Sequence, residues 1–254
     1  MKTDAMTQEN QAEAEIQRLN SELDAANQNL EAFNYSVSHD LRAPLRHILG
    51  FVGILQAAAG RTLDESTRQH LQIIAQSAAR MERMFDALTE FSRIGQAEMH
   101  FAQTSLAALV EDVRRDFRGE IKGRDIEWQI GDLPEVTGDP TMLRQAVVNL
   151  LSNAIKYSRT RRKAKIAIGA TNGEHETICF VRDNGVGFDM KCADRLFGMF
   201  QRFHRSEEFA GTGAGLATVR RIVSRHGGRT WAEGKTGGGA TFYFSIPKPP
   251  EETP

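Results

Sequence analysis

The stretch FNYSVSHDLRAPL, residues 33–45, decides how the first part of the chain folds. An apolar seam with alternating spacings of three and four residues runs into this stretch, a pattern typical of a coiled coil. The seam consists of Ile16, Leu19, Leu23, Ala26, Leu30, Phe33 and Val37. Its register predicts that His39 lies on the outward face of a long helix. Beyond His39 the apolar positions restart one residue out of register, and Pro44 predicts a kink nearby.

His39 is a candidate phosphoryl acceptor. An exposed imidazole can act as a nucleophile near neutral pH, and Asp40 directly after it can accept the Nδ1 proton, which leaves Nε2 for attack. A solvated surface histidine without chemistry is the alternative that this stretch alone leaves open.

Length and charge bound the class of protein. The chain has 254 residues and a formal net charge of −1, which gives no electrostatic reason to expect a nucleic acid or an anionic membrane as partner. No apolar run approaches the ~18 residues that span a bilayer, and the polar N-terminus does not resemble a signal peptide. Cys179 and Cys192 have no metal-like spacing and fit a reducing compartment. We therefore expect a cytoplasmic protein.

A second seamed helix is expected at residues 64–94, after a short loop. Its apolar positions are Leu71, Ile74, Ala78, Met81, Phe85 and Leu88. Two seamed helices joined by a short loop form an antiparallel hairpin. One hairpin leaves much of each apolar stripe in water, so the sequence favours a homodimer in which two chains form a four-helix bundle.

The pattern changes to mixed helices and strands beyond residue 104. Helices are expected at 106–117, 139–157 and 214–226, and strands at 125–130, 165–170, 177–182, 229–233 and 240–246. This order predicts an α/β domain with helices over one sheet. The expected divisions are an N-terminal coiled-coil helix at 1–30, the hairpin at 31–95, a linker at 96–104, the α/β domain at 105–247 and a tail at 248–254.

The stretch NLLSNAIKY, residues 149–157, is the first of four pieces that suggest a nucleotide site. It places Asn149, Asn153 and either Lys156 or Tyr157 on one helical face. Amide oxygens are hard ligands, so Asn153, with Asn149 beside it, is a candidate to hold Mg²⁺, and Lys156 is a candidate to meet phosphate oxygens. The alternative is the polar outer face of an amphipathic helix.

Two glycine-rich stretches follow. In DNGVGF, residues 183–188, Asp183 can accept a hydrogen bond from an exocyclic amine such as that of adenine, while Gly185 and Gly187 let the backbone approach a flat ligand. The stretch at 211–216 opens a helix whose backbone N–H groups suit phosphates. Its candidate residues are Gly211, Thr212, Gly213, Gly215 and Leu216. Each stretch alone also fits a turn, and their order carries the argument.

The fourth piece is LFGMFQRFHR, residues 196–205. Phe197, Phe200 and Phe203 have helical spacing and predict a mobile lid, from which Arg205 can reach a γ-phosphate. A solvated arginine is the alternative.

In this order the motifs resemble those of the sensor histidine kinase family. Residues 39–45 resemble its H box, 149–156 its N box, 183–187 its G1 box, 197–203 its F box and 211–215 its G2 box. The resemblance implies a dimerisation and histidine-phosphotransfer hairpin followed by a Bergerat-type α/β sandwich that binds ATP with Mg²⁺. It also implies autophosphorylation of His39, with Asp40 and Arg205 in catalytic roles, and phosphotransfer to an aspartate in the receiver domain of a response regulator.

Further details of the sequence refine this resemblance. YSVS, residues 35–38, is similar to the phytochrome and PAS-linked branch of the family. Ala43 stands where the family often has Thr or Asn, and a methyl group cannot orient a water, so kinase output is favoured over phosphatase output. No sensor or receiver domain is recognised, so we expect the catalytic core of a longer protein.

Three other functions compete with this interpretation. Related ATPases of the gyrase, mismatch-repair and chaperone kind carry a carboxylate at the position of Asn149, and an amide cannot act as a general base. A serine kinase of the anti-sigma type is disfavoured on the same ground and by the attached histidine hairpin. A non-catalytic coiled-coil adaptor is the third alternative, which ATP binding would exclude.

Overall fold

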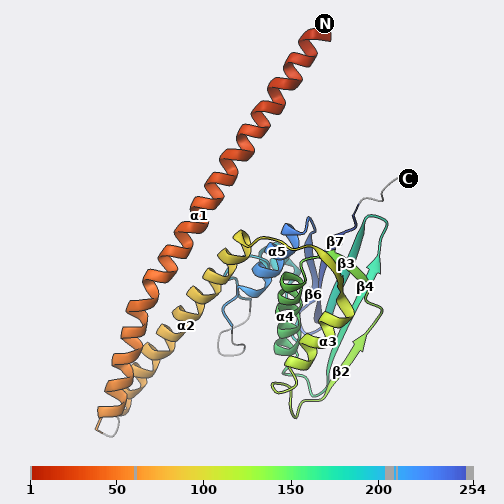
Figure 1. The fold of residues 1–254 in the computed structure, drawn as a ribbon. Helices are drawn as coiled ribbons and strands as arrows, with labels where there is room; N and C mark the ends of the chain where they lie inside the picture. The colour runs from red at the N-terminus through yellow and green to blue at the C-terminus, as the bar shows by residue number, and fades with distance from the viewer. Residues whose placement is uncertain (1, 60–61, 204–208, 210, 250–254) are drawn as a thin grey trace. The chain divides into compact units, whose positions relative to one another are not determined.

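The computed structural model describes residues 2–59, 62–203, 209 and 211–249 (Figure 1). Within the first helix, the side chains of several residues, His39 among them, lie outside this description. The chain divides into two compact units, Met1–Ser92 and Arg93–Pro254. No described helix is both long and apolar enough to cross a membrane.

The first unit is the helical hairpin that the two seams predict. Helix α1 spans Lys2–Ala59 and continues through Pro44, and helix α2 spans Glu65–Gln96. Asp64 caps α2, because its Oδ1 accepts the N–H of Thr67 at 2.8 Å. An ion pair of 3.0 Å between Arg42 and Asp86 joins the two helices, which confirms their antiparallel course.

The hairpin leaves many large apolar side chains in water. Those exposed in this unit are Ile16, Leu19, Leu41, Ile48, Phe51, Ile54, Leu55, Ile73, Ile74 and Met81. Among its described apolar side chains, only Leu45, Val52 and Ala78 are buried. An apolar surface of this extent is typical of an interface rather than of a free surface.

The second unit is the predicted α/β domain, built on a five-stranded sheet. Its elements are β1 (Ala102–Ser105), α3 (Leu106–Asp116), β2 (Ile126–Ile130), β3 (Glu135–Gly138), α4 (Pro140–Tyr157), β4 (Ala164–Asn172), β5 (Glu176–Asp183), the short 3₁₀-helix η1 (Met190–Arg195), α5 (Gly215–Arg225), β6 (Thr230–Lys235) and β7 (Gly239–Pro247). The main sheet has the order β2-β4-β5-β7-β6, with β2 and β4 parallel and the other pairs antiparallel. Helices α3, α4 and α5 cover one face of it (Figure 1).

Two elements differ from the sequence prediction. Strands β1 and β3 pair with each other as a separate two-stranded sheet, and β1 lies in the stretch expected to be a linker. Residues 196–203, whose phenylalanines have helical spacing and were expected to form a lid, contain turns and irregular backbone and no helix. Gly198 interrupts the run, and Phe200 has a left-handed backbone with φ of 59°, which no α-helix contains.

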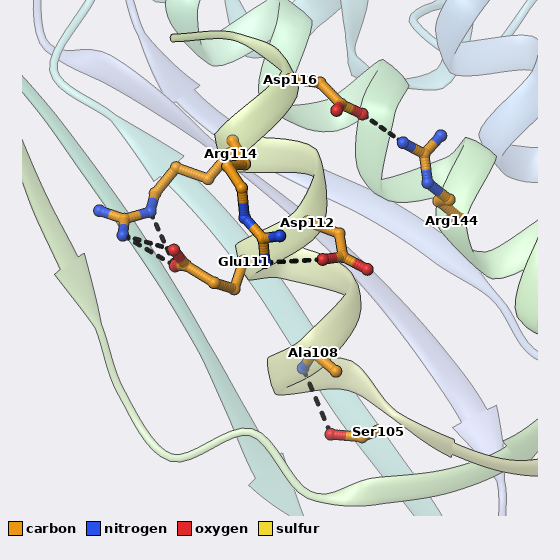
Figure 2. Close-up of polar contacts among 8 residues, drawn as sticks. Ser105, Ala108, Glu111, Asp112, Arg114, Asp116 and Arg144 are labelled. Carbon is orange, nitrogen blue, oxygen red and sulfur yellow. Dashed lines mark hydrogen bonds and ion pairs between the residues drawn. The ribbon is translucent and has the colours of Figure 1, made fainter.

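Helix α3 shows how local chemistry sets the helix bounds. Ser105 Oγ accepts the N–H of Ala108 at 3.3 Å and so caps the helix (Figure 2). The outer face carries two ion pairs at a spacing of three residues, Glu111 with Arg114 and Asp112 with Arg115. A third pair joins Asp116 to Arg144 of α4. These exposed pairs add little stability, so burial of Leu106, Val110 and Val113 holds α3 in place.

Helix α4 has one buried, apolar face and one polar face. Its buried stripe consists of Met142, Leu143, Ala146, Val147, Leu150, Leu151, Ala154 and Ile155. This stripe packs in one core with sheet residues such as Ile166, Val181 and Phe242. Asn149, Ser152, Asn153 and Lys156 are therefore left on the opposite face.

Asp139 joins three segments at the start of α4. Its Oδ1 accepts the N–H groups of Thr141 and Met142 at 2.9 and 3.0 Å, which caps the helix, and its Oδ2 accepts the N–H of His100 at 2.9 Å. Its own N–H donates to Nε2 of His226 at 2.9 Å, and Nδ1 of that imidazole donates to Ile222 O at 2.8 Å. Only a neutral imidazole can make both contacts.

This arrangement predicts that the second unit loses stability as His226 becomes protonated. Burial lowers the pKa of His226 below 6.5, so the unfolded chain binds the proton more readily, and stability falls once the pH drops below about 6.5. His226→Gln should cost about 1–2 kcal/mol at pH 7.5. The cost should shrink at pH 5.5, because only the parent must keep a buried imidazole uncharged.

Urea unfolding followed by tryptophan fluorescence measures this effect, since both tryptophans, Trp128 and Trp231, belong to the second unit. His175→Gln, at an exposed histidine, is the matched control and should keep the pH dependence of the parent. An equal cost of His226→Gln at both pH values would contradict the assignment.

Candidate functional site

A cavity of about 250 Å³ opens in the second unit beside the polar face of α4. The end of β5, the turns after η1, the start of α5 and the beginning of β7 complete its wall. Eleven of the twelve residues predicted to bind a cofactor line it: Asn149, Asn153, Lys156, Tyr157, Asp183, Gly187, Gly211, Thr212, Gly213, Gly215 and Leu216. Segments that are far apart in the sequence, from Asn149 to Phe242, thus meet at one site.

Gly185, the remaining predicted residue, supports the wall from behind. Its N–H donates to Asp183 Oδ1 at 2.8 Å, and a Cβ at this position would lie 2.4 Å from the carbonyl oxygen of Tyr157. At Gly187, which has a φ of 63°, a Cβ would lie 2.0 Å from Lys235 O. Both glycines are therefore required for close backbone packing.

Asp183 places a carboxylate at the end of β5. The residue is only 4% exposed. Burial raises the pKa of its carboxyl to about 6, against the opposing effect of the N–H groups of Gly185 and Ala240 and of the positive charge of Arg161. The group is therefore ionised near neutral pH and can accept a hydrogen bond from an amine.

Two cations, Lys156 and Arg202, also line the cavity. Burial, together with the positive charge of Arg202, lowers the pKa of Lys156 to about 8. Lys156 Nζ lies 4.4 Å from the centroid of the Tyr157 ring, and a Cβ at Gly211 would lie 3.3 Å from it. Two cations held close together in a partly buried wall favour an anionic ligand.

The glycine loop and the first turn of α5 adjoin these cations. Gly211 and Gly213 have φ values of 143° and 81°, and Ala214 at the N-cap of α5 offers no side-chain oxygen. The first turn of a helix presents backbone N–H groups and a partial positive charge. Gly215 is needed here, because a Cβ would lie 2.8 Å from Asn149 Oδ1.

The amides of α4 are the candidate metal ligands. Asn149 Nδ2 donates to Gln145 O at 3.0 Å, and Asn153 follows one turn later on the same wall. Among the described residues no group of three or more His, Cys, Asp or Glu forms a metal cage. An amide beside two cations that could meet phosphate oxygens fits Mg²⁺, which usually takes few protein ligands together with substrate phosphates and water.

Several residues of the wall were not predicted from the sequence. Arg202, Gln201 and Ser152 line the cavity, as do Phe188 and Phe242. Arg202 also donates to Phe209 O at 2.6 Å. Ser152 lies on the same helical face as Asn149, and this spacing is the signal that would have found it.

The catalytic candidates lie elsewhere in the chain. His39 and Asp40 belong to α1 in the first unit, and the side chain of Asp40 is exposed. The His39 side chain and all of Arg205 lie outside the described residues.

Two protein families match the chain. The family described as His Kinase A (phospho-acceptor) domain matches residues 29–97. The family described as Histidine kinase-, DNA gyrase B-, and HSP90-like ATPase matches residues 138–250. The first match covers the part of the hairpin that contains His39, and the second covers every residue that lines the cavity.

Curated relatives extend the similarity over nearly the whole chain. The methanogenesis regulatory histidine kinase FilI of Methanothrix harundinacea is 35% identical over 239 residues, which cover 94% of this chain and 27% of FilI. Cyanobacterial phytochrome B of Nostoc is 36% identical over 235 residues, which cover 91% of this chain and 31% of the phytochrome. The chain thus spans less than a third of the length of these relatives.

Solved structures of histidine kinases share the fold of this chain. The crystal structure of full-length ShkA in complex with AMPPNP has a TM-score of 0.59 and 26% identity, with 85% of this chain and 45% of ShkA covered. A phospho-acceptor family on the hairpin, an ATPase family on the α/β unit and this common fold agree with each other. The chain therefore belongs to the sensor histidine kinase family and carries the phospho-acceptor and ATP-binding domains of a protein histidine kinase.

Proposed function

We propose that this chain is the kinase core of a two-component sensor. It transfers the γ-phosphoryl group of ATP to His39 and then to an aspartate in the receiver domain of a response regulator. The observation that carries this proposal is the cavity, which combines one buried carboxylate, an amide face and two cations in a chain whose other unit contains His39.

Asp183 is the adenine-binding residue in this proposal. Its buried carboxylate accepts a hydrogen bond from the exocyclic amine of adenine. Guanine carries a carbonyl oxygen at that place, and two acceptors that face each other leave the buried carboxylate unsatisfied. The site therefore selects ATP over GTP.

The phosphates lie at the positive end of the cavity. Lys156, Arg202 and the first turn of α5 bind phosphate oxygens, and the amide of Asn153, with Asn149 beside it, holds Mg²⁺. When bound, the metal neutralises charge on the phosphates during transfer. Arg205 follows the Arg202 segment and adds a further positive charge for the γ-phosphate.

His39 is the acceptor. Asp40 accepts the Nδ1 proton of the imidazole, and Nε2 attacks the γ-phosphorus. The new N–P bond forms as the bond between the γ-phosphorus and the bridging oxygen breaks, and ADP leaves. Catalysis by this route comes from positioning and charge stabilisation.

The same function implies an oligomeric state and a division of the chain into domains. The chain acts in the cytoplasm as a homodimer, which the exposed apolar stripe of the hairpin supports. Residues 1–30 form the signalling helix, 31–95 the phosphotransfer hairpin, 96–104 the linker, 105–247 the catalytic domain and 248–254 a tail. A sensor domain belongs to the longer protein, as the length of the relatives suggests.

His39→Gln should abolish autophosphorylation and leave nucleotide affinity within about twofold of the parent, because the acceptor belongs to a different unit from the cavity. The measurement is incorporation of label from γ-labelled ATP, together with an acid-lability test. His47→Gln, an exposed histidine on the same helix, is the matched control and should keep the label. Label that survives His39→Gln means that the acceptor is another residue.

Asp183→Asn should weaken ATP and ADP binding alike, by about 10–100-fold, because both ligands carry adenine and a hydrogen bond to a charged group contributes about 1.5–3 kcal/mol. Asn153→Ala should instead weaken chiefly the increase in affinity that Mg²⁺ produces. Titration calorimetry with and without Mg²⁺ separates the two effects. Equal affinities of the parent for ATP and GTP would refute the adenine role.

The dimer should dissociate when the seam of α2 receives a charge. Ile74→Glu should raise the dimer dissociation constant by at least about tenfold, because burying an unpaired carboxylate is costly. Ile73→Glu is the matched control, since Ile73 is also exposed but lies outside the seam. Sedimentation equilibrium measures both variants. A parent that remains monomeric at high concentration excludes the four-helix bundle.

A further inference from the structure

Arg161 binds three backbone carbonyl groups behind the wall of the cavity. It follows α4 and does not itself line the cavity. Its Nε donates to Asn184 O at 2.7 Å, and its Nη2 donates to Gly185 O at 2.9 Å and to Gly237 O at 2.6 Å. The guanidinium is the side chain best suited to this task, because it presents several donors in one rigid plane.

The three carbonyls belong to two loops that adjoin Asp183. Asn184 and Gly185 directly follow Asp183, and Gly237 lies in the turn between β6 and β7. Within this turn, the N–H of Gly237 also donates to Val186 O at 2.7 Å. At Gly239 a Cβ would lie only 2.1 Å from Asp183 O. The loops are therefore packed backbone against backbone, and Arg161 joins them at the point where their carbonyls converge.

Other contacts hold this loop from a different side. Asn184 Oδ1 accepts the N–H of Lys165 at 2.8 Å, and Asn184 Nδ2 donates to Lys163 O at 3.1 Å. These bonds tie the loop to β4, whereas Arg161 ties it to the β6–β7 turn. Loss of Arg161 should thus loosen one side of the loop without releasing it from the sheet.

Arg161 also acts on Asp183 through its charge. Burial raises the pKa of the Asp183 carboxyl, and the guanidinium of Arg161 is the side-chain charge that lowers it. Tyr157 is the other titratable side chain that interacts with this carboxyl, and burial raises the pKa of its hydroxyl, so it is neutral at the pH values of interest. Removal of the positive charge at residue 161 should therefore raise the pKa of the Asp183 carboxyl, because less of the effect of burial is compensated.

We propose that Arg161 is a positioning residue for nucleotide recognition, which fixes the loop that carries Asp183 and stabilises its carboxylate. This inference rests on the proposed function, because it takes Asp183 as the group that binds adenine. Arg161 makes two contributions, the geometry of its hydrogen bonds and its positive charge. Loss of the hydrogen bonds should weaken binding equally at every pH, whereas loss of the charge should weaken binding more at low pH.

The test measures the dissociation constant of ADP by titration calorimetry from pH 5.5 to 8 with the full chain. The dissociation constant of each variant is divided by that of the parent at the same pH. This ratio cancels the titration of ADP itself. Arg161→Lys keeps the charge and loses the planar set of donors, so its ratio should be about tenfold and nearly independent of pH. Arg161→Met loses both, so its ratio should exceed that of Arg161→Lys and should rise further as the pH falls from 8 to 6.

Two controls accompany these variants. Arg162→Met removes an exposed arginine next in the chain, and its ratio should stay near one. In an Asp183→Asn background, the pH dependence of the Arg161→Met ratio should vanish, because no carboxyl remains to be protonated. With labelled ATP, Arg161→Lys should raise KM and leave kcat nearly unchanged, whereas loss of folded protein would lower the apparent kcat instead.

The outcomes separate the two proposals. Parent protein that binds no ADP overturns the proposed function and this inference with it. Parent protein that binds ADP, with both Arg161 variants binding like the parent, overturns this inference alone. Equal, pH-independent ratios for the two variants also overturn it, since Arg161 would then have a structural role without an effect on the carboxylate. If Arg161→Met does not fold, Arg161→Lys decides by its KM and kcat.

Discussion

The cavity of the α/β unit depends on the two faces of α4, one of which is apolar and buried while the other is polar. Eight of its residues are buried, and they pack with the sheet in a single core. Burial of this stripe orients the helix, because turning it would expose apolar surface and bury amides. The amides of Asn149 and Asn153 are thus oriented by the hydrophobic effect, before any ligand contributes.

The cavity combines two groups whose pKa values are shifted toward neutrality from opposite directions. Burial raises the pKa of Asp183 to about 6 and lowers that of Lys156 to about 8. Both are charged in the interval between these values, and both line the same small cavity. A cavity with one acidic and one basic group suits a ligand that combines a hydrogen-bond donor with negative charge.

Sequence reasoning found the residues whose spacing reveals them. Asn149, Asn153 and Lys156 follow helical periodicity, and Asp183 and the glycines stand where strands end or helices begin. Arg202 and Arg161 were missed because each donates to backbone carbonyl groups, of a nearby loop in the first case and of distant segments in the second, and such contacts have no periodic signature. Strands β1 and β3 were missed for a related reason, since four residues are too few to show alternation. The helical spacing of the phenylalanines at 197, 200 and 203 does not produce a helix, because Gly198 and the left-handed backbone of Phe200 interrupt it.

The two faces of α4 also determine which changes the chain can tolerate there. A substitution on either face alters one side chain and leaves the others in place. An insertion or deletion of one residue between Asn149 and Asn153 is different in kind, because each residue turns an α-helix by about 100°. Everything on one side of the change would rotate relative to the other, so one amide would leave the cavity while apolar residues left the core. Homologous chains can therefore be expected to vary in length after Tyr157, where α4 ends, and to keep the length of α4 itself.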